Sequence, residues 1–314
     1  MLRTALVLVA ACEACGGHSG DLWITEHALP TANSGPYGIA AGGDGALWFT
    51  EQVGKIGRIT IAGEVTELTV PTPDAIPYHI APARDGSLWF TEKAANAIGH
   101  ITLDGVITEF GLPRSQSVPT GIAAGPDDAM WFVEDDGNAV GTITSTGIIT
   151  EYPLVAGNNE AYGIALGPDG SLWFTEQGTN HIATIDAART ITEFAVPTAS
   201  ADLREIIAGP DGNLWFTEFT GGNSIGTITP AGVITERALP TAGAQPFDIT
   251  VGPDHDLWFT EKVGNAIGRI TTAGVFSERA IPTESSEPAR ITLGPDGNLW
   301  FSEYAANQIG CVTL

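Results

Sequence analysis

The sequence predicts an all-β fold, a seven-bladed β-propeller built from four-stranded blades. Two observations lead to this prediction. A Leu-Trp-Phe-Thr-Glu motif or a close variant recurs seven times at intervals of 41 to 43 residues, with its tryptophan at Trp48, Trp89, Trp131, Trp173, Trp215, Trp258 and Trp300. A fixed period of this length is typical of propellers and solenoids. In addition, the last repeat lacks one strand, and a matching spare strand precedes the first repeat.

Each repeat contains four short strand patterns separated by turn residues, as the fourth repeat illustrates. We expect strands over 162–166, 172–176, 181–185 and 191–194, with a Gly-Pro-Asp-Gly turn after the first. The continuous apolar run Leu-Trp-Phe is typical of a strand covered on both faces, and the alternating Ile-Thr-Glu-Phe of an outer strand half in water. Four-stranded units that pack radially form a propeller.

The two chain ends predict how the ring closes. The last repeat stops at Leu314 after its third strand, whereas the segment Asp21–Glu26 resembles the outer strand of every repeat, for example Val233–Glu236. We therefore expect the N-terminal strand to complete the last blade, which an open superhelical solenoid would not need. Residues 21–314 are expected to form one monomeric propeller domain.

Residues 1–20 are expected to be a leader and a flexible tether. Arg3 precedes the short apolar run Ala5–Ala11, and Val9-Ala10-Ala11-Cys12 has the form of a bacterial lipobox. Lipidation of Cys12 would place the protein in the bacterial cell envelope or periplasm, with the lipid as its only membrane contact. The alternative is an ordinary signal peptide. A disulfide between Cys15 and Cys311 is also possible through the tether.

The charge balance excludes nucleic acid as a partner. The chain has 13 Lys and Arg against 37 Asp and Glu, a net charge of −24, and such a surface repels phosphate backbones. Cations, cationic ligands and basic peptides remain possible. The sequence also lacks a Gly-x-Ser-x-Gly nucleophile elbow, a His-Glu-x-x-His metal motif and a Gly-rich phosphate loop.

One face of the ring, called the upper face here, is expected to carry the function. The start of each inner strand and the end of each second strand meet there. Each second strand ends in a glutamate, and we call these the ring glutamates: Glu51, Glu92, Glu134, Glu176, Glu218, Glu261 and Glu303. They could hold a divalent cation through oxygen ligands. Alternatively, each could be a structural hydrogen-bonding group repeated in every blade.

The inner strands differ between blades in their third residue. Three blades carry glycine there, whereas the others carry His79, Glu205, Asp248 and Arg290. The preceding residues include Tyr37, Tyr78, Tyr162, Arg204 and Phe247. This aromatic and charged set suits a polar ligand that contains a ring. In the alternative interpretation Arg204, Glu205, Asp248 and Arg290 neutralise one another and plug the channel.

The repeat resembles that of the streptogramin B lyases, also called virginiamycin B lyases. It follows their pattern Gly-Pro-Asp-Gly-x-Leu-Trp-Phe-Thr-Glu, then Asn-x-Ile-Gly-x-Ile-Thr, then Gly-x-Ile-Thr-Glu-x-x-Leu-Pro-Thr, over about residues 21–314. The resemblance implies a propeller that opens the ring ester of an antibiotic by β-elimination, with Mg²⁺ and histidine acid–base chemistry.

The sequence departs from that family where the resemblance places its histidines. They follow the proline at the start of the inner strand in the sixth and seventh repeats, where this chain has Phe247 and Ala289. Neither side chain can transfer a proton, which general acid catalysis requires. The resemblance also implies a glutamate just after Trp-Phe in the last repeat, and Glu303 is the nearest, offset by one residue. His79 and Glu303 remain as catalytic candidates, and Glu261 and Glu303 as Mg²⁺ ligands.

Three functions are consistent with these patterns. The first is a cell-envelope propeller that binds a small polar or cyclic ligand at the upper face and lacks the family's lyase activity. The second is a metal-assisted elimination or hydrolysis of a cyclic ester or lactone that uses His79 and a carboxylate-bound metal. The third is a scaffold that binds another protein at the upper face.

Overall fold

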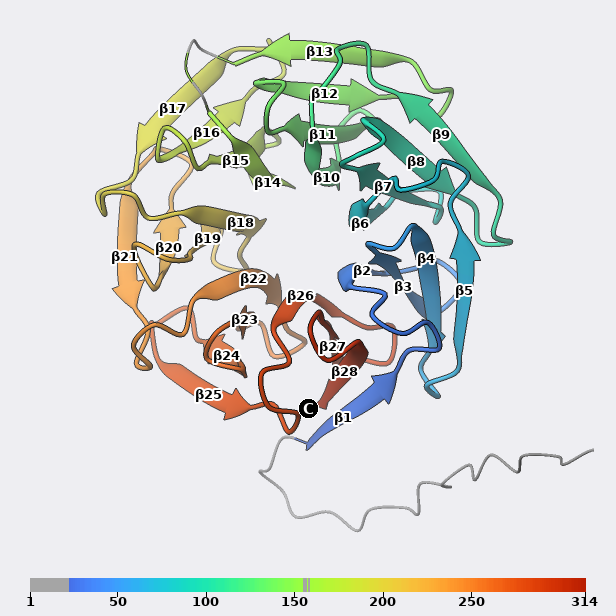
Figure 1. Ribbon diagram of the computed structural model, residues 1–314. Helices are drawn as coiled ribbons and strands as arrows, with labels where there is room; N and C mark the ends of the chain where they lie inside the picture. Colours follow the sequence, from blue (N-terminus) through green and yellow to red (C-terminus); the bar gives the residue numbers. More distant parts are fainter. Residues whose placement is uncertain (1–22, 155–156, 158) are drawn as a thin grey trace, which may run out of the picture.

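The chain folds into a closed ring of seven four-stranded antiparallel sheets (Figure 1). The computed structural model describes residues 23–154, 157 and 159–314. The predicted seven-bladed propeller is confirmed, and the strands of the fourth repeat begin and end within one residue of their predicted bounds. The described residues contain strands and turns only, so none of their segments is a helix able to cross a membrane.

The blades follow one another along the chain, each running from the channel outwards. Blade 1 contains β2 (Pro36–Ala41), β3 (Ala46–Glu51), β4 (Lys55–Thr60) and β5 (Val65–Thr69). Blade 2 contains β6 (Pro77–Pro82), β7 (Leu88–Glu92), β8 (Ala97–Ile101) and β9 (Ile107–Gly111). Blade 3 contains β10 (Pro119–Ala124), β11 (Met130–Glu134), β12 (Ala139–Ile143) and β13 (Ile149–Pro153). Blade 4 contains β14 (Ala161–Leu166), β15 (Leu172–Glu176), β16 (His181–Ile185) and β17 (Ile191–Ala195).

The second half of the ring repeats this order until the last blade. Blade 5 contains β18 (Leu203–Ala208), β19 (Leu214–Glu218), β20 (Ser224–Ile228) and β21 (Ile234–Ala238). Blade 6 contains β22 (Pro246–Val251), β23 (Leu257–Glu261), β24 (Ala266–Ile270) and β25 (Phe276–Ala280). Blade 7 contains β26 (Pro288–Leu293), β27 (Leu299–Glu303), β28 (Gln308–Thr313) and, as its outer strand, β1 (Trp23–Ala28).

The N-terminal strand closes the ring as predicted. β1 pairs antiparallel with β28, in a register that runs from Trp23 opposite Thr313 to Ala28 opposite Gln308. Leu29, just after β1, is buried in a core cluster shared by blades 7 and 1. The two ends of the described chain therefore lie in one blade, and the edge of β28 is covered (Figure 1).

Packing and hydrogen bonds explain why the motif residues recur in the blades. The motif tryptophans and phenylalanines are all at most 3% exposed and fill the space between neighbouring blades. In six blades the indole N–H donates to the aspartate of the preceding turn, as from Trp173 to Asp169 at 3.1 Å. Glycine in the third strand makes room for the phenylalanine, because a Cβ at Gly57 would lie 2.1 Å from the ring of Phe49.

The motif hydroxyl joins each blade to the next. Thr50 Oγ1 accepts the Gly38 N–H at 2.8 Å and donates to the Tyr78 carbonyl of blade 2 at 2.7 Å. Equivalent threonines serve blades 2, 4, 5 and 6, and Ser302 Oγ closes the circle by donating to the Tyr37 carbonyl at 2.6 Å. These hydrogen bonds run around the channel, so they fix the geometry of the upper face.

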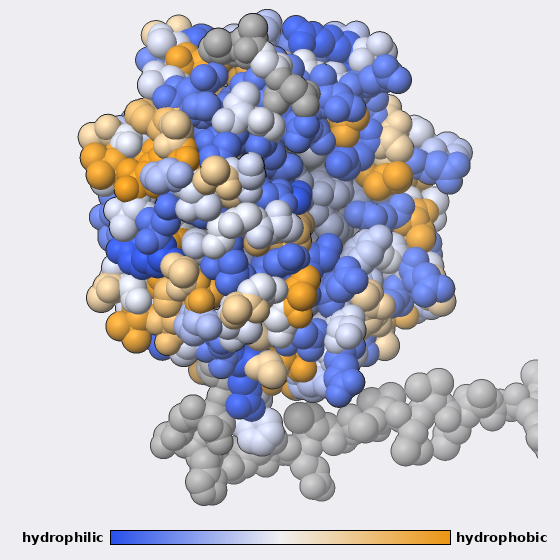
Figure 2. All heavy atoms as spheres, turned by 60° about the vertical axis from the view of Figure 1, so that its left-hand side comes forward, coloured by the Kyte–Doolittle hydropathy of each residue, from blue (hydrophilic) through white to orange (hydrophobic). Residues whose placement is uncertain are grey.

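The outer wall of the ring is mostly hydrophilic. Figure 2 shows polar residues over most of the visible side, with apolar residues in small separate groups. Exposed apolar side chains such as Ile148, Val233 and Val275 belong to the outer parts of different blades. Scattered apolar residues of this kind are normal on a protein surface. We therefore look for the functional site at the channel.

Candidate functional site

A buried ion cluster closes the channel at mid-height. Arg290 on β26 is 1% exposed, and its Nη1 contacts Glu205 Oε2 on β18 and lies 3.3 Å from Asp248 Oδ1 on β22. The guanidinium also packs 5.6 to 5.8 Å from the rings of Tyr37, Tyr162 and Phe247. One cation thus joins carboxyl groups from two other blades, as the interpretation of a charge-neutralised plug expects.

Two of the blade-specific side chains also link neighbouring inner strands. Asp248 Oδ2 accepts the N–H of Ile291 at 2.7 Å, and His79 Nδ1 accepts the N–H of Ile122 at 3.0 Å. Burial raises the pKa of Asp248 to about 7, against backbone hydrogen bonds that lower it. Burial lowers the pKa of His79 well below its ordinary value, and the positive charge of Arg290 lowers it further. His79 is therefore a neutral imidazole at neutral pH.

Three tyrosines cover this ion cluster on the side of the upper face. The hydroxyl groups of Tyr37, Tyr78 and Tyr162 lie 2.5 to 2.6 Å from one another and form a closed triangle of hydrogen bonds. Burial raises the pKa of Tyr37 and of Tyr78 well above the ordinary value. Tyr37 and Tyr78 are therefore neutral, and the triangle forms a floor below the mouth of the channel.

A pocket of about 300 Å³ opens above this floor, and we call it the upper mouth. Six of its lining residues are aromatic: Tyr37, Tyr78, Tyr162, Phe219, Phe247 and Tyr304. The other three are polar: Gln52, Arg204 and Lys262. Arg204 is placed here, away from the ion cluster with which the sequence grouped it, and its Nη2 pairs with Asp202 Oδ1 at 2.8 Å. The lining contains neither imidazole nor carboxylate.

Several residues of the upper mouth escaped the sequence analysis. Gln52, Phe219, Lys262 and Tyr304 each follow a ring glutamate directly, as does Lys93, whose Nζ lies 4.6 Å from the Tyr78 ring centroid. This position differs among most blades, whereas the glutamate before it never changes. That contrast within the repeat is the signal that would have identified them.

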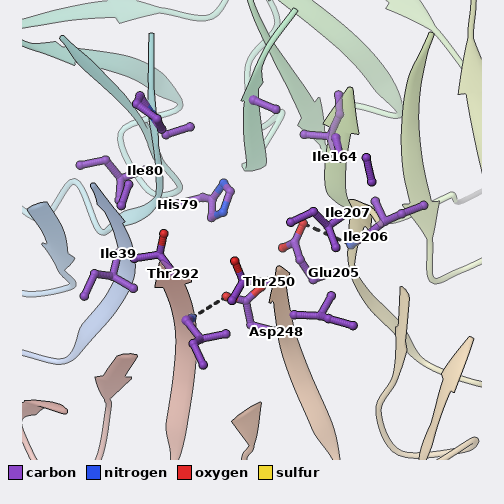
Figure 3. Close-up of a pocket in the computed structure, with 18 of the residues that line it drawn as sticks. Ile39, His79, Ile80, Ile164, Glu205, Ile206, Ile207, Asp248, Thr250 and Thr292 are labelled. Atoms are coloured by element: carbon purple, nitrogen blue, oxygen red, sulfur yellow. Dashed lines mark hydrogen bonds between the residues drawn. The ribbon is translucent and has the colours of Figure 1, made fainter. Parts of the chain in front are cut away.

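A second cavity, of about 320 Å³, lies at the opposite end of the channel. Its lining comes largely from the later residues of the inner strands and is mostly apolar. His79, Glu205 and Asp248 extend into it from three different blades, together with Thr250 and Thr292 (Figure 3). The structure therefore separates the predicted ligand-binding set. Tyr37, Tyr78, Arg204 and Phe247 line the upper mouth, whereas His79, Glu205 and Asp248 line this lower cavity and Arg290 lies between the two.

The ring glutamates turn towards the outer strands of their own blades. All seven are at most 1% exposed. Burial and, to a smaller extent, the nearby carboxylate of Glu109 on β9 raise the pKa of Glu92 to about 8. Glu109 in turn accepts hydrogen bonds from the backbone and hydroxyl of Thr72, at the end of blade 1, at 2.9 and 2.7 Å. A buried ring glutamate beside an outer-strand glutamate is thus a structural pair that the blades repeat.

This arrangement does not fit the Mg²⁺ site that the family resemblance implies. Burial raises the pKa of Glu261 to about 8 and that of Glu303 to about 7, and each has its own outer-strand glutamate as neighbour. Within the described part of the chain, no three His, Cys, Asp or Glu side chains are grouped so as to hold a metal ion. We therefore derive no chemical step through Mg²⁺, and its binding stays a prediction.

The buried carboxyl groups predict that stability falls as pH rises from about 5 to 8. Unfolded glutamates release their protons near pH 4.3, whereas burial raises the folded pKa to about 7 for Glu51, Glu134 and Glu303 and to about 8 for Glu92, Glu218 and Glu261. The folded state therefore binds more protons in this window, and their stabilising contribution is lost as pH passes the folded values.

Urea unfolding at half-unit pH steps measures this slope. The isosteric Glu92→Gln variant removes one titrating group, so its stability should fall less steeply than that of the unmodified chain. A Glu64→Gln variant, at an exposed turn, is the matched control and should leave the slope unchanged. Stability that rises between pH 5 and 8 would contradict the assignment of protonated ring glutamates.

The remaining predictions of the sequence concern the cysteines and the leader. Cys311 on β28 is buried and forms no disulfide within the described residues, and burial raises the pKa of its thiol to about 12. Cys12, Cys15 and the leader 1–20 lie outside the described residues. Lipidation of Cys12 and pairing of Cys15 with Cys311 therefore stay predictions.

Comparisons with known proteins agree with the fold and the repeat. Residues 15–204 and 199–314 match the model of the virginiamycin B lyase family. Curated relatives include virginiamycin B lyases of Saccharopolyspora erythraea, 54% identical over 44 residues, and of Bacillus licheniformis, 46% identical over 43 residues. These matches span 14% and 13% of this chain and 15% of each relative, so they cover about one repeat.

Solved structures match over nearly the whole ring. The virginiamycin B lyase of Staphylococcus aureus is 42% identical with a TM-score of 0.89, and the match covers 94% of this chain and all of that one. A catalytically inactive histidine-to-alanine variant of the Staphylococcus aureus enzyme with quinupristin is 41% identical with the same TM-score and the same coverage. The WD40 propeller of Doa1, 10% identical with a TM-score of 0.75 over 93% of this chain and 97% of that one, shares the fold alone.

Proposed function

Because the chain belongs to the virginiamycin B lyase family, we propose that it binds a small, ring-containing polar or cyclic ligand at the upper mouth. It does so without the histidine-based elimination that the family resemblance implies. One observation carries the proposal: the upper mouth is lined by six aromatic and three polar residues, among which there is no histidine, aspartate or glutamate.

The lining supports binding rather than elimination. General acid–base catalysis needs a group whose pKa lies near the working pH. Phe247 and Ala289 occupy the positions where the resemblance places histidines, and both are buried beside the tyrosine triangle. Tyr37 and Tyr78 have raised pKa values and bond to one another, so they are poor proton acceptors. Rings with a few convergent polar groups are, in contrast, typical of a ligand pocket.

The two other functions from the sequence find less support. The metal-assisted alternative needs His79 close to a metal-binding carboxylate at the upper face, and His79 lies in the lower cavity. The scaffold alternative needs a contact surface of about 800 Å² on each partner, whereas the upper mouth is a confined pocket. We also propose that the protein is exported to the bacterial cell envelope or periplasm as a monomer, which the leader sequence and the closed ring support.

We expect no measurable opening of quinupristin, with or without Mg²⁺. The physical reason is that Phe247 and Ala289 stand where the resemblance places the histidines, and that the lining of the upper mouth holds no histidine, aspartate or glutamate. Elimination leaves the mass of the antibiotic unchanged and creates a carbon–carbon double bond, so chromatography and the vinyl proton resonance measure it. The virginiamycin B lyase of Staphylococcus aureus serves as the positive control. Turnover comparable to that enzyme would show that another group supplies the chemistry.

A further inference from the structure

We propose that the ligand of the upper mouth is an aromatic or other planar ring that carries a carboxylate. This inference rests on the proposed function and adds the charge of the ligand, which neither the family nor the sequence assigns. It is carried by the distribution of cations, by their geometry over the rings and by an unpartnered donor in the pocket.

The charge of the upper mouth is opposite to that of the protein. The chain has 37 acidic and 13 basic residues, yet the pocket lining holds two basic residues, Arg204 and Lys262, and no acidic one. Lys93 adds a third cation at the rim, over the Tyr78 ring. Of the three lysines of the chain, one therefore lines this pocket and a second lies over a ring of its floor. In a protein of net charge −24, such a concentration favours an anionic ligand at this point.

Each of the three cations lies over an aromatic ring of the pocket. Lys262 Nζ lies 5.1 Å from the Phe247 ring centroid, and the Arg204 guanidinium lies 4.8 Å from that of Phe219. Their acidic partners do not line the pocket. Lys93 and Lys262 lie 4.0 and 3.7 Å from Asp135 and Glu287, so these ion pairs are long and a carboxylate ligand would contact the ammonium groups more closely.

The pocket also contains a donor that no described residue satisfies. Arg204 Nη2 bonds Asp202, but Arg204 Nε is buried and has no hydrogen-bond partner among the described residues. A buried N–H without an acceptor is unfavourable, and a carboxylate would satisfy it with a charge-assisted hydrogen bond. Burial lowers the pKa of Lys93 and of Lys262, and the charge of Arg204 lowers both further, against the carboxylates of Asp135 and Glu287 that raise them.

The rings define the other half of the ligand. Phe219, Phe247 and Tyr304 present ring faces and edges to the pocket, with Phe219 and Phe247 at 5.5 Å in an edge-to-face pair. A volume of about 300 Å³ accommodates a fused pair of aromatic rings. The carboxylate would face Arg204 and Lys262, and the ring would lie against the phenylalanines.

Three naphthalene probes of equal size test the proposal: anionic 2-naphthoate, neutral 2-naphthamide and cationic 2-naphthamidine. Calorimetric titrations at low ionic strength give the dissociation constants. We expect 2-naphthoate to bind at least about tenfold more tightly than 2-naphthamide, and 2-naphthamidine to bind most weakly. The preference for naphthoate should shrink severalfold in Lys262→Met and, independently, in Lys93→Met. Lys55→Met is the matched control, because the third lysine pairs with Glu67 at 2.7 Å away from the pocket.

The outcomes separate this inference from the proposed function. If naphthamide or naphthamidine binds as tightly as naphthoate, the inference about charge is wrong, whereas ligand binding at the mouth stands. A preference for naphthoate that Lys55→Met reduces as much as Lys262→Met would also overturn it. If none of the three probes binds, the inference and the proposed binding function both fail.

Discussion

Replacing Arg290 with methionine should lower the free energy of unfolding by about 3–5 kcal/mol, the usual effect of removing one partner from a buried ion cluster. Arg290 is 1% exposed and is the cation that faces Glu205 and Asp248, which are 5% and 6% exposed. Without it, two buried carboxyl groups must take up protons or remain charged in a medium of low dielectric constant. Urea unfolding monitored by tryptophan fluorescence at pH 7 measures the loss.

A neutralised variant provides the control for this prediction. The triple change Arg290→Met, Glu205→Gln and Asp248→Asn removes all the charges and keeps similar shapes, so it should be more stable than Arg290→Met alone. The Asp248→Asn and Arg290→Met changes combined should likewise cost less than the sum of the two single changes. Strict additivity would mean that the three side chains do not act as one cluster.

Deleting residues 1–29 should destabilise the ring severely and promote self-association. The deletion removes β1 and Leu29, so β28 loses its hydrogen-bonded partner and becomes an exposed sheet edge. Ile24 and Leu29 pack against two core clusters, and each such side chain contributes roughly 1.5–3 kcal/mol when fully buried. Glu26, which accepts hydrogen bonds from Thr283 at 2.9 and 3.0 Å, is lost as well.

Calorimetry measures the melting temperature of this deletion variant, and sedimentation velocity measures its oligomeric state. The chain that lacks only residues 1–20 is the comparator. We expect a lower melting temperature and higher oligomers for the 1–29 deletion alone. A synthetic peptide that spans residues 21–31, added in excess, should recover part of the stability. An unchanged melting temperature in a monomeric 1–29 deletion would mean that β1 does not close the ring.

The fold could be predicted from the sequence because equivalent residues of the repeats have the same local environment, so the same pattern recurs in each blade. The spacing of the tryptophans predicted the number of blades, and the spare strand before Thr31 predicted the closure. Exceptions within single blades could not be predicted. Blade 3 carries Val133 where the other blades have a hydroxyl, and Thr120 Oγ1 takes over the bond to the next blade by donating to the Ala161 carbonyl at 2.8 Å. Only the structure shows that Thr120 takes over this hydrogen bond, because it places Thr120 next to Ala161.

The candidate site was predicted in part. Glu205, Asp248 and Arg290 were identified because they stand where three other blades have glycine in the inner strand. Their position in the repeat did not show that their side chains lie below the tyrosine triangle. Arg204 precedes Glu205 in the chain, but it lines the upper mouth whereas Glu205 lines the lower cavity, and the strand register is irregular between Leu203 and Ile206. Lys93 and Lys262 were missed because they belong to turns, where the motif pattern ends and the repeat carries no strand signal.

Fluorine resonances of 3-fluorotyrosine test the location of the ligand most directly. Tyr37, Tyr78, Tyr162 and Tyr304 line the upper mouth, whereas Tyr152, the fifth tyrosine of the chain, stacks on Trp131 within the blades at 5.8 Å. A titration with 2-naphthoate should shift or broaden the four resonances of the mouth and leave that of Tyr152 unchanged. Saturable binding that leaves all four mouth resonances in place would contradict the assignment of the upper mouth as the ligand site.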